Sequence, residues 1–206
     1  MHTASRTALL LALVFTLGLA ACDSDPNDGE GLPLNATVVE NLPADPAVNI
    51  GPMGPVGTGH FTFFSLRENE VVADSASSDW DLGLRATEII VNGGVSGPGE
   101  GRAQVTEGLF EEITEAPEAG WRTDNAEGHA IRTGSGNGWY NYNPQAMIVS
   151  PIPGRVILVQ TADGKYAKLR IISYYKDAPE TPDVDSESRY YTFEYVFQPD
   201  GSRILE

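Results

Sequence analysis

The sequence predicts a single all-β domain built from antiparallel strands and hairpins. Short runs rich in aromatic and β-branched residues recur along the chain, turn signals such as Gly-Gly and Asp-Gly separate them, and no long stretch has helical periodicity. Glycine and proline are both frequent, at 22 and 14 residues, which favours strands and turns over helices. The 206 residues suffice for one such domain, and no internal repeat indicates a solenoid or a propeller.

The expected strands of the first half follow a stretch rich in Gly and Pro at residues 51–59. They are residues 60–66, 79–85, 88–91 and 103–110. The second of these runs alternates apolar and polar side chains, as a strand with one buried face does. The third stops at Asn92-Gly93-Gly94, which is a turn signal. Residues 111–119 are expected to form a short helix or an irregular excursion.

The clearest hairpin lies in the second half of the chain. Asp163-Gly164 separates a β-branched run at residues 155–161 from a long run at residues 165–175, and Asp-Gly is a strong hairpin signal. The alternation in the second run places Ala167, Leu169, Ile171 and Ser173 on one face and Tyr166, Lys168, Arg170 and Ile172 on the other. Residues 189–198 predict another strand, with Tyr191, Phe193, Tyr195 and Phe197 on one side. Residues 203–205 predict a last short strand.

Residues 1–21 are typical of a secretory signal peptide. Arg6 gives the segment a positive start, and residues 8–21 are uncharged, mostly apolar and too few for a comfortable transmembrane helix. The segment ends in Leu19-Ala20-Ala21-Cys22, which is similar to the bacterial lipobox. We therefore expect cleavage before Cys22 and acylation of that residue by fatty acids such as palmitate. The alternative is an ordinary signal peptide with a chance cysteine near its end.

Residues 22–35 are acidic and rich in Gly and Pro, which predicts a flexible tether because such a segment has little apolar area to bury. Residues 36–206 then form the all-β domain. Several acyl chains on one cysteine would anchor that domain firmly in a membrane of the cell envelope. Acidic residues directly after the lipidated cysteine fit either retention at the inner membrane or export to the cell surface, so these residues alone leave the leaflet open.

Charge and cysteine content exclude several classes of protein. The chain has 13 Lys and Arg against 29 Asp and Glu, a formal net charge of −16, whereas a nucleic-acid-binding protein needs a basic surface. One cysteine forms neither an internal disulfide nor a Cys-type zinc site. No G-x-S-x-G nucleophile motif is present, and no spacing of carboxylates indicates a glycoside hydrolase. We assign no catalytic residue and expect a protein that is not an enzyme.

Two side chains outside the signal peptide are candidate metal ligands. His129 lies in a polar loop, and a neutral imidazole is a common metal ligand. Met147 follows an aromatic cluster at residues 139–142, and a methionine thioether can bind haem iron. His60, which precedes an aromatic run, is a less favoured candidate. Each of these residues also has an ordinary alternative, as a surface histidine or as a methionine that fills the core.

Several segments, in this order along the chain, resemble one known family. They are the lipobox at Cys22, the run at residues 61–66, Asp79-Trp80-Asp81-Leu82 running into residues 89–97, the Trp139-Tyr140-Asn141-Tyr142 element, the hairpin at residues 161–175 and the run at residues 190–195. Together they resemble the HmuY family of bacterial haem-binding lipoproteins, from about residue 58 to the end of the chain. The hairpin around Asp163-Gly164 is the most specific of these blocks.

The resemblance implies an HmuY-like all-β fold in an outer-membrane or surface lipoprotein that binds haem or a related tetrapyrrole and passes it to an outer-membrane transporter. In the family two axial side chains, both His or both Met, clamp the iron. His129 lies in the part of the chain where the first ligand is expected, and Met147 is the nearest candidate for the second; such a mixed pair favours ferrous iron. Trp139, Tyr140 and Tyr142 are candidates for the walls of the pocket.

Two other functions stay open. An envelope lipoprotein with the same fold could bind a polysaccharide, a peptide or a protein without haem, through exposed Tyr and Trp side chains. A carbohydrate-active enzyme would place two carboxylates about 5–9 Å apart across a groove. His129 and Met147 on the two sides of one cleft would favour the haem carrier, whereas burial of both in a packed core would remove its mechanism.

Overall fold

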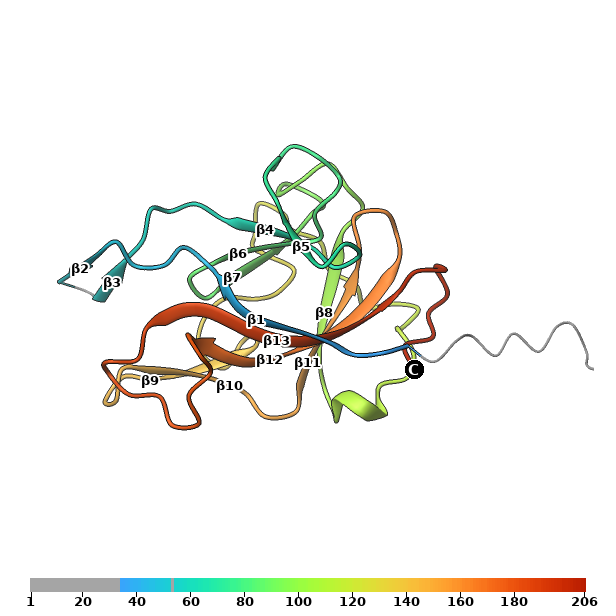
Figure 1. Ribbon diagram of the computed structural model, residues 1–206. Helices are drawn as coiled ribbons and strands as arrows, with labels where there is room; N and C mark the ends of the chain where they lie inside the picture. The colour runs from blue at the N-terminus through green and yellow to red at the C-terminus, as the bar shows by residue number, and fades with distance from the viewer. Residues whose placement is uncertain (1–33, 53) are drawn as a thin grey trace, which may run out of the picture. The chain divides into compact units, whose positions relative to one another are not determined.

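The computed structural model describes residues 34–52 and 54–206, and Figure 1 shows their arrangement. These residues form thirteen strands and one turn of 3₁₀ helix, η1 (Phe110–Glu112). Every pairing between named strands is antiparallel, which confirms the predicted all-β class. The predicted signal peptide, the lipidation site Cys22 and the tether up to residue 33 lie outside the described residues.

The larger sheet carries the long strands of the second half of the chain. Its order is β1 (Thr37–Pro43), β13 (Ser188–Gln198), β12 (Tyr166–Tyr175), β11 (Arg155–Gln160) and β8 (Arg102–Glu107). In Figure 1, β1 from the N-terminal end of the domain runs along β13 from its C-terminal end. The two ends of the described chain therefore belong to one sheet.

The predicted Asp163-Gly164 turn joins β11 to β12. Gln160 pairs with Tyr166, and the Thr161 N–H donates to the Lys165 carbonyl at 2.8 Å. Gly164 has a φ of +81°, a conformation that glycine adopts without strain. The hairpin that the sequence indicated most strongly is present.

The second sheet and two small hairpins complete the strands. The second sheet has the order β5 (Glu70–Val72), β4 (Thr62–Ser65), β6 (Leu82–Arg85) and β7 (Glu88–Val91). The small hairpins are β2 (Asn49–Gly51) with β3 (Gly54–Val56), and β9 (Tyr140–Asn143) with β10 (Ile148–Pro151).

Apolar faces of the two larger sheets meet in one core. Leu169 and Ile171, which the alternation in β12 placed on one face, both belong to this core. Phe193 of β13 packs edge to face against Phe64 of β4, with the ring centres 5.6 Å apart. This contact joins strands more than 100 residues apart in the sequence by hydrophobic packing.

The opposite face of β12 is also partly covered. Lys168, on the face opposite Leu169 and Ile171, is only 4% exposed. Its ammonium group donates to the carbonyls of Phe110 and Ile113, at 2.9 and 2.8 Å. The segment around η1 therefore lies over this part of the sheet and satisfies the buried charge with backbone acceptors.

Of two expectations near the chain's turns, one is met and one is corrected. Residues 111–119 are mostly irregular, one of the two predicted alternatives, and their helical structure is limited to the end of η1. Residues 203–205 do not form a strand: Ile204 makes a single bridge to Glu115, and the Leu205 N–H donates to the Thr114 carbonyl at 2.8 Å. This end pairs with an irregular loop, which offers too few aligned groups for a ladder.

Several short strands were not predicted. They are β1, β2, β3, β5, β9 and β10. Most of their residues are exposed or half-buried, so their hydrophobic patterns are weak.

Among the described residues, no helix is long and apolar enough to span a membrane.

Candidate functional site

His129 lies in the connection between β8 and β9, next to a buried carboxylate. Its Nδ1 is 3.9 Å from Oδ2 of Asp124; the Asp124 side chain is 0% exposed and the His129 side chain 30% exposed. Nδ1 is itself buried and has no hydrogen-bond partner among the described residues. The exposed part of the His129 side chain therefore lies elsewhere than at Nδ1.

Met147 lies in the turn of the β9–β10 hairpin and is 61% exposed. The side-chain oxygen of Asn143 accepts hydrogen bonds from the N–H groups of Gln145 and Ala146, at 3.0 and 3.1 Å, which shapes the turn. Tyr142 belongs to the same hairpin and is also exposed. The thioether and this aromatic ring are both accessible to a ligand.

Trp139 and Tyr140, the other two candidate wall residues, lie in the hydrophobic core. Trp139 is 2% exposed, and its Nε1–H donates to the Thr87 carbonyl at 3.1 Å. Its ring centre lies 5.2 Å from that of Tyr191 and 4.9 Å from that of Tyr140. These contacts attach the base of the β9–β10 hairpin to the core, so the two residues support the hairpin that carries Met147.

His60 lies apart from these residues in a different part of the fold. It is exposed and lines a cavity of about 390 Å³ together with Asp45, Thr58 and Phe61. Neither His129 nor Met147 lines this cavity. The structure therefore gives His60 no shared site with the two favoured candidates.

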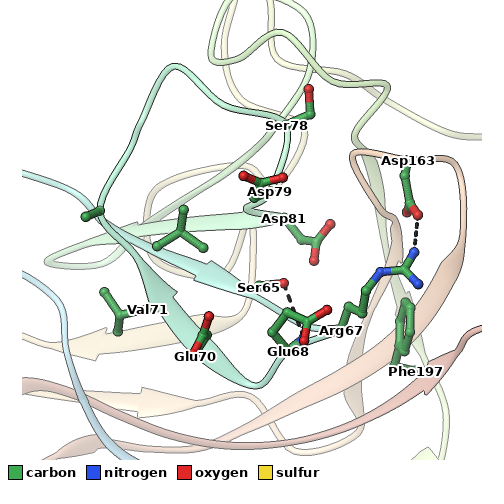
Figure 2. Close-up of a pocket in the computed structure, with 12 residues that line it drawn as sticks. Ser65, Arg67, Glu68, Glu70, Val71, Ser78, Asp79, Asp81, Asp163 and Phe197 are labelled. Atoms are coloured by element: carbon green, nitrogen blue, oxygen red, sulfur yellow. Dashed lines mark hydrogen bonds and ion pairs between the residues drawn. The ribbon is translucent and has the colours of Figure 1, made fainter.

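A larger cavity of about 490 Å³ was not expected from the sequence (Figure 2). It is lined by Ser65, Arg67, Glu68, Glu70, Val71, Val72, Ala73, Ser78, Asp79, Asp81, Asp163 and Phe197. These residues come from the β4–β5 hairpin, the segment before β6, the β11–β12 turn and β13. The one local signal was the spacing of Asp79 and Asp81, which places both side chains on the same side of an extended segment.

One wall of this cavity is an ion pair stacked on an aromatic ring. Figure 2 shows Arg67 reaching Asp163, with Phe197 beneath its guanidinium group. The Arg67 guanidinium carbon lies 5.4 Å from the ring centre of Phe197, a cation–π distance. Burial raises the pKa of Asp163, but a hydrogen bond from Thr161 and the charge of Arg67 outweigh it, so this pKa lies below its ordinary value.

Asp81 lies at the bottom of the same cavity and links the two larger sheets. It is 6% exposed, and its two oxygens accept the backbone N–H groups of Leu66 at 2.8 Å and Ala162 at 3.0 Å. Burial raises the pKa of Asp81 from 3.8 to about 6, although both hydrogen bonds act in the opposite direction. Asp81 therefore joins the segments after β4 and β11 by buried hydrogen bonds, and its ionised form is destabilised by burial.

The lining of this cavity does not suit haem. It contains five carboxylates, Arg67 as its one cation, and neither His nor Met. The propionates of haem are anionic and would meet like charges there. No group of three or more His, Cys, Asp or Glu side chains in residues 34–52 and 54–206 is placed to hold a metal ion. Neither His129 nor Met147 lines this cavity.

Asn92, in a segment singled out in the sequence, makes structural contacts. Its side chain is buried, donates to the carbonyls of Ser77 and Trp80 at 3.0 and 2.8 Å, and accepts the N–H of Gly99 at 3.0 Å. All the polar atoms of the Asn92 amide group are thereby used within the fold. The Asn92 side chain therefore has a structural role in this part of the chain.

Solved structures that are similar to this chain include the following three. An apo HmuY analogue from Tannerella forsythia has 16% identity and a TM-score of 0.44, and the match covers 81% of this chain and 96% of that chain. A proposed HmuY-like haem-binding protein from Bacteroides vulgatus has 16% identity and a TM-score of 0.44, covering 79% and 91%. A proposed lipoprotein from Bacteroides fragilis has 16% identity and a TM-score of 0.42, covering 66% and 83%.

No curated protein sequence matches this chain. The family model described as HmuY protein matches residues 58–195, which is more than half of the chain. This range begins just before β4 and ends within β13, so it includes His129, the β9–β10 hairpin and every residue that lines the cavity of about 490 Å³ except Phe197. The chain therefore belongs to the HmuY family.

Proposed function

We propose that this protein is a lipid-anchored, non-enzymatic carrier of haem or a related tetrapyrrole in the cell envelope. Membership of the HmuY family supports the class of ligand. The observation that carries the proposal is the state of His129, whose Nδ1 is buried beside Asp124 while 30% of the side chain is exposed. An imidazole held in this way fits an axial position on haem iron.

Met147 is the proposed second ligand. Its thioether is accessible in the turn of a hairpin whose base is packed into the core by Trp139 and Tyr140. Haem, when bound, supplies an iron centre that accepts one donor atom on each face. The exposed ring of Tyr142, on the same hairpin, would then contact the apolar macrocycle.

The proposed anchor is the acylated Cys22, which follows the signal peptide at residues 1–21 and precedes the tether at residues 22–35. The proposed location is the outer membrane with the domain at the cell surface, and the proposed partner is an outer-membrane haem transporter. Cys22→Ser is expected to remove the protein from the membrane fraction, because one acidic domain without lipid has little affinity for anionic bilayers. A variant that stays in that fraction would contradict the anchor.

Titration of the full chain in detergent with haem is expected to shift the Soret band to saturation at one haem per protein. His129→Ala and Met147→Ala should each weaken binding about tenfold or more, equivalent to at least about 1.4 kcal/mol, because each removes one iron ligand. Absorption spectroscopy of the ferric and ferrous forms measures both effects.

His60→Ala is the matched control, since it removes an exposed imidazole that lines a different cavity. It is expected to leave the Soret shift and the affinity unchanged. If the folded protein gives no Soret shift, the proposal that it binds haem is refuted. The alternative, an envelope module that binds a polysaccharide, a peptide or a protein, is then favoured. A shift that is unaltered in both ligand variants would refute the ligation by His129 and Met147.

A further inference from the structure

Asp124 occupies a position that its own loop and a neighbouring strand define. Its Oδ1 accepts the backbone N–H of Ala130 at 2.6 Å, and its Oδ2 accepts the backbone N–H of Val91 in β7 at 3.1 Å. Its backbone carbonyl also accepts the N–H of Val95 at 3.1 Å. The carboxylate is therefore held by two backbone N–H groups, one from its own loop and one from β7, and the Asp124 backbone is held by a third, so the carboxylate has little freedom to turn away.

The loop between Asp124 and Ala130 presents His129 to this carboxylate. Asn125 and Gly128 exchange two backbone hydrogen bonds of 3.1 Å, which close the loop into a tight turn. His129 directly follows that turn and directly precedes Ala130, whose N–H is bound by Asp124. The short path between these contacts places the His129 ring beside the carboxylate.

The two protonation forms of the neutral ring are not equivalent in this place. A proton on Nδ1 would place the positive end of an N–H bond 3.9 Å from a buried carboxylate, which is too far for a hydrogen bond but close enough for electrostatic attraction. A lone pair on Nδ1 would instead face the negative oxygen and be repelled by it. Electrostatics therefore favours the form with Nδ1–H and a lone pair on Nε2.

We propose that Asp124 is a positioning residue that holds His129 in its Nδ1–H form, so that the Nε2 lone pair is presented to an incoming metal centre. That this centre is haem iron rests on the function proposed above. Carboxylates in this position orient the ring of a ligating histidine and increase its basicity. Asp124 itself does not touch the ligand.

The first experiment needs neither a variant nor haem. Two-dimensional ¹H–¹⁵N spectra of the haem-free full chain, with ¹⁵N-labelled histidine and at about pH 8.5, report which ring nitrogen carries the proton in the neutral form. His129 is expected to show a protonated Nδ1 and an unprotonated Nε2. His60, which is exposed, is the internal reference and should show mainly Nε2–H, the form that free histidine favours. His129→Gln and His60→Gln assign the signals. A His129 signal with Nε2–H would overturn the proposal.

The second experiment compares Asp124→Asn with Glu127→Gln, which neutralises an exposed carboxylate in the same loop. Asp124→Asn is expected to increase the Nε2–H population of His129 and to weaken haem binding about 10–100-fold, while Glu127→Gln changes neither. If Asp124→Asn fails to fold, the spectrum of the wild-type chain still decides the proposal. An Nδ1–H ring in a chain that binds no haem supports the positioning role and refutes only the haem carrier. An Nε2–H ring in a chain that binds haem refutes only the role of Asp124.

Discussion

Replacing Trp139 by alanine is expected to lower the free energy of unfolding by about 3–5 kcal/mol, the usual cost of removing a large buried aromatic side chain. Trp139 is 2% exposed and packs against Tyr140, Tyr174 and Tyr191. The variant loses these contacts and also leaves the Thr87 carbonyl without its indole donor. Urea unfolding of the haem-free protein, with a slope unchanged from that of the parent chain, measures the loss.

Tyr142→Ala is the matched control for this variant. Tyr142 is an aromatic residue of the same hairpin but is 44% exposed, so its loss should change the free energy of unfolding by no more than about 0.5 kcal/mol. Trp139→Phe should fall between the two. A loss in the free energy of unfolding below about 1 kcal/mol for Trp139→Ala would contradict the core role of this side chain. Such a result would favour the alternative that Trp139 lines an open ligand pocket.

Asp81 is expected to make the protein less stable as the pH rises from about 4 to about 7. Burial raises the pKa of Asp81 from 3.8 to about 6, so the folded chain holds this proton more tightly than the unfolded chain does. The contribution of Asp81 is therefore fully present below the unfolded pKa and is lost as the pH passes through the folded pKa. This shift corresponds to about 3 kcal/mol.

The comparison with Asp81→Asn isolates this contribution from that of the other carboxylates, among them Asp163, whose lowered pKa acts with the opposite sign. At about pH 4 the variant should be less stable by about 1–3 kcal/mol, because an amide oxygen replaces only one of two acceptors for buried N–H groups. At about pH 7 the difference in free energy of unfolding between the parent chain and the variant should decrease by about 3 kcal/mol or change sign, because asparagine carries no buried charge.

Denaturant unfolding at several pH values measures this gap. Asp79→Asn is the control, since it removes an exposed carboxylate from the same cavity and retains Asp81. Its own stability should keep the dependence on pH seen in the parent chain. A gap between the parent chain and Asp81→Asn that is constant from about pH 4 to about pH 7 would refute the buried, proton-binding state of Asp81.

Local patterns predicted those parts of the fold in which adjacent residues carry the information. The β-branched and aromatic runs marked β11, β12 and β13, and Asp163-Gly164 marked the turn between the first two. The weaker runs of β1 and β5 were missed because partly exposed, short strands have little hydrophobic alternation. The burial of Lys168 could not be predicted from its own strand, because it depends on a segment more than 50 residues away.

Some residues of the candidate site could likewise be chosen from the sequence, whereas others are apparent only in the folded structure. The imidazole of His129 and the thioether of Met147 could be chosen from the sequence because few soft or imidazole ligands exist in the chain. The burial of Asp124 beside His129 could not, since nothing in its local pattern distinguishes it from the other acidic residues of this chain. The roles of Trp139 and Tyr142 also differ only in the folded state, where one lies in the core and the other on the surface.

The sequence by itself determined the all-β class, the central hairpin and the family to which the chain belongs. Only the tertiary structure decided which polar side chains meet: Arg67 with Asp163, Asp81 with the backbone of Ala162, and Asp124 with His129. The physical reason is that a period of two tells which side of a strand is apolar but not which strand it will face. Burial and charge at a site arise from segments distant in the chain, and these come together only when the sheets pack.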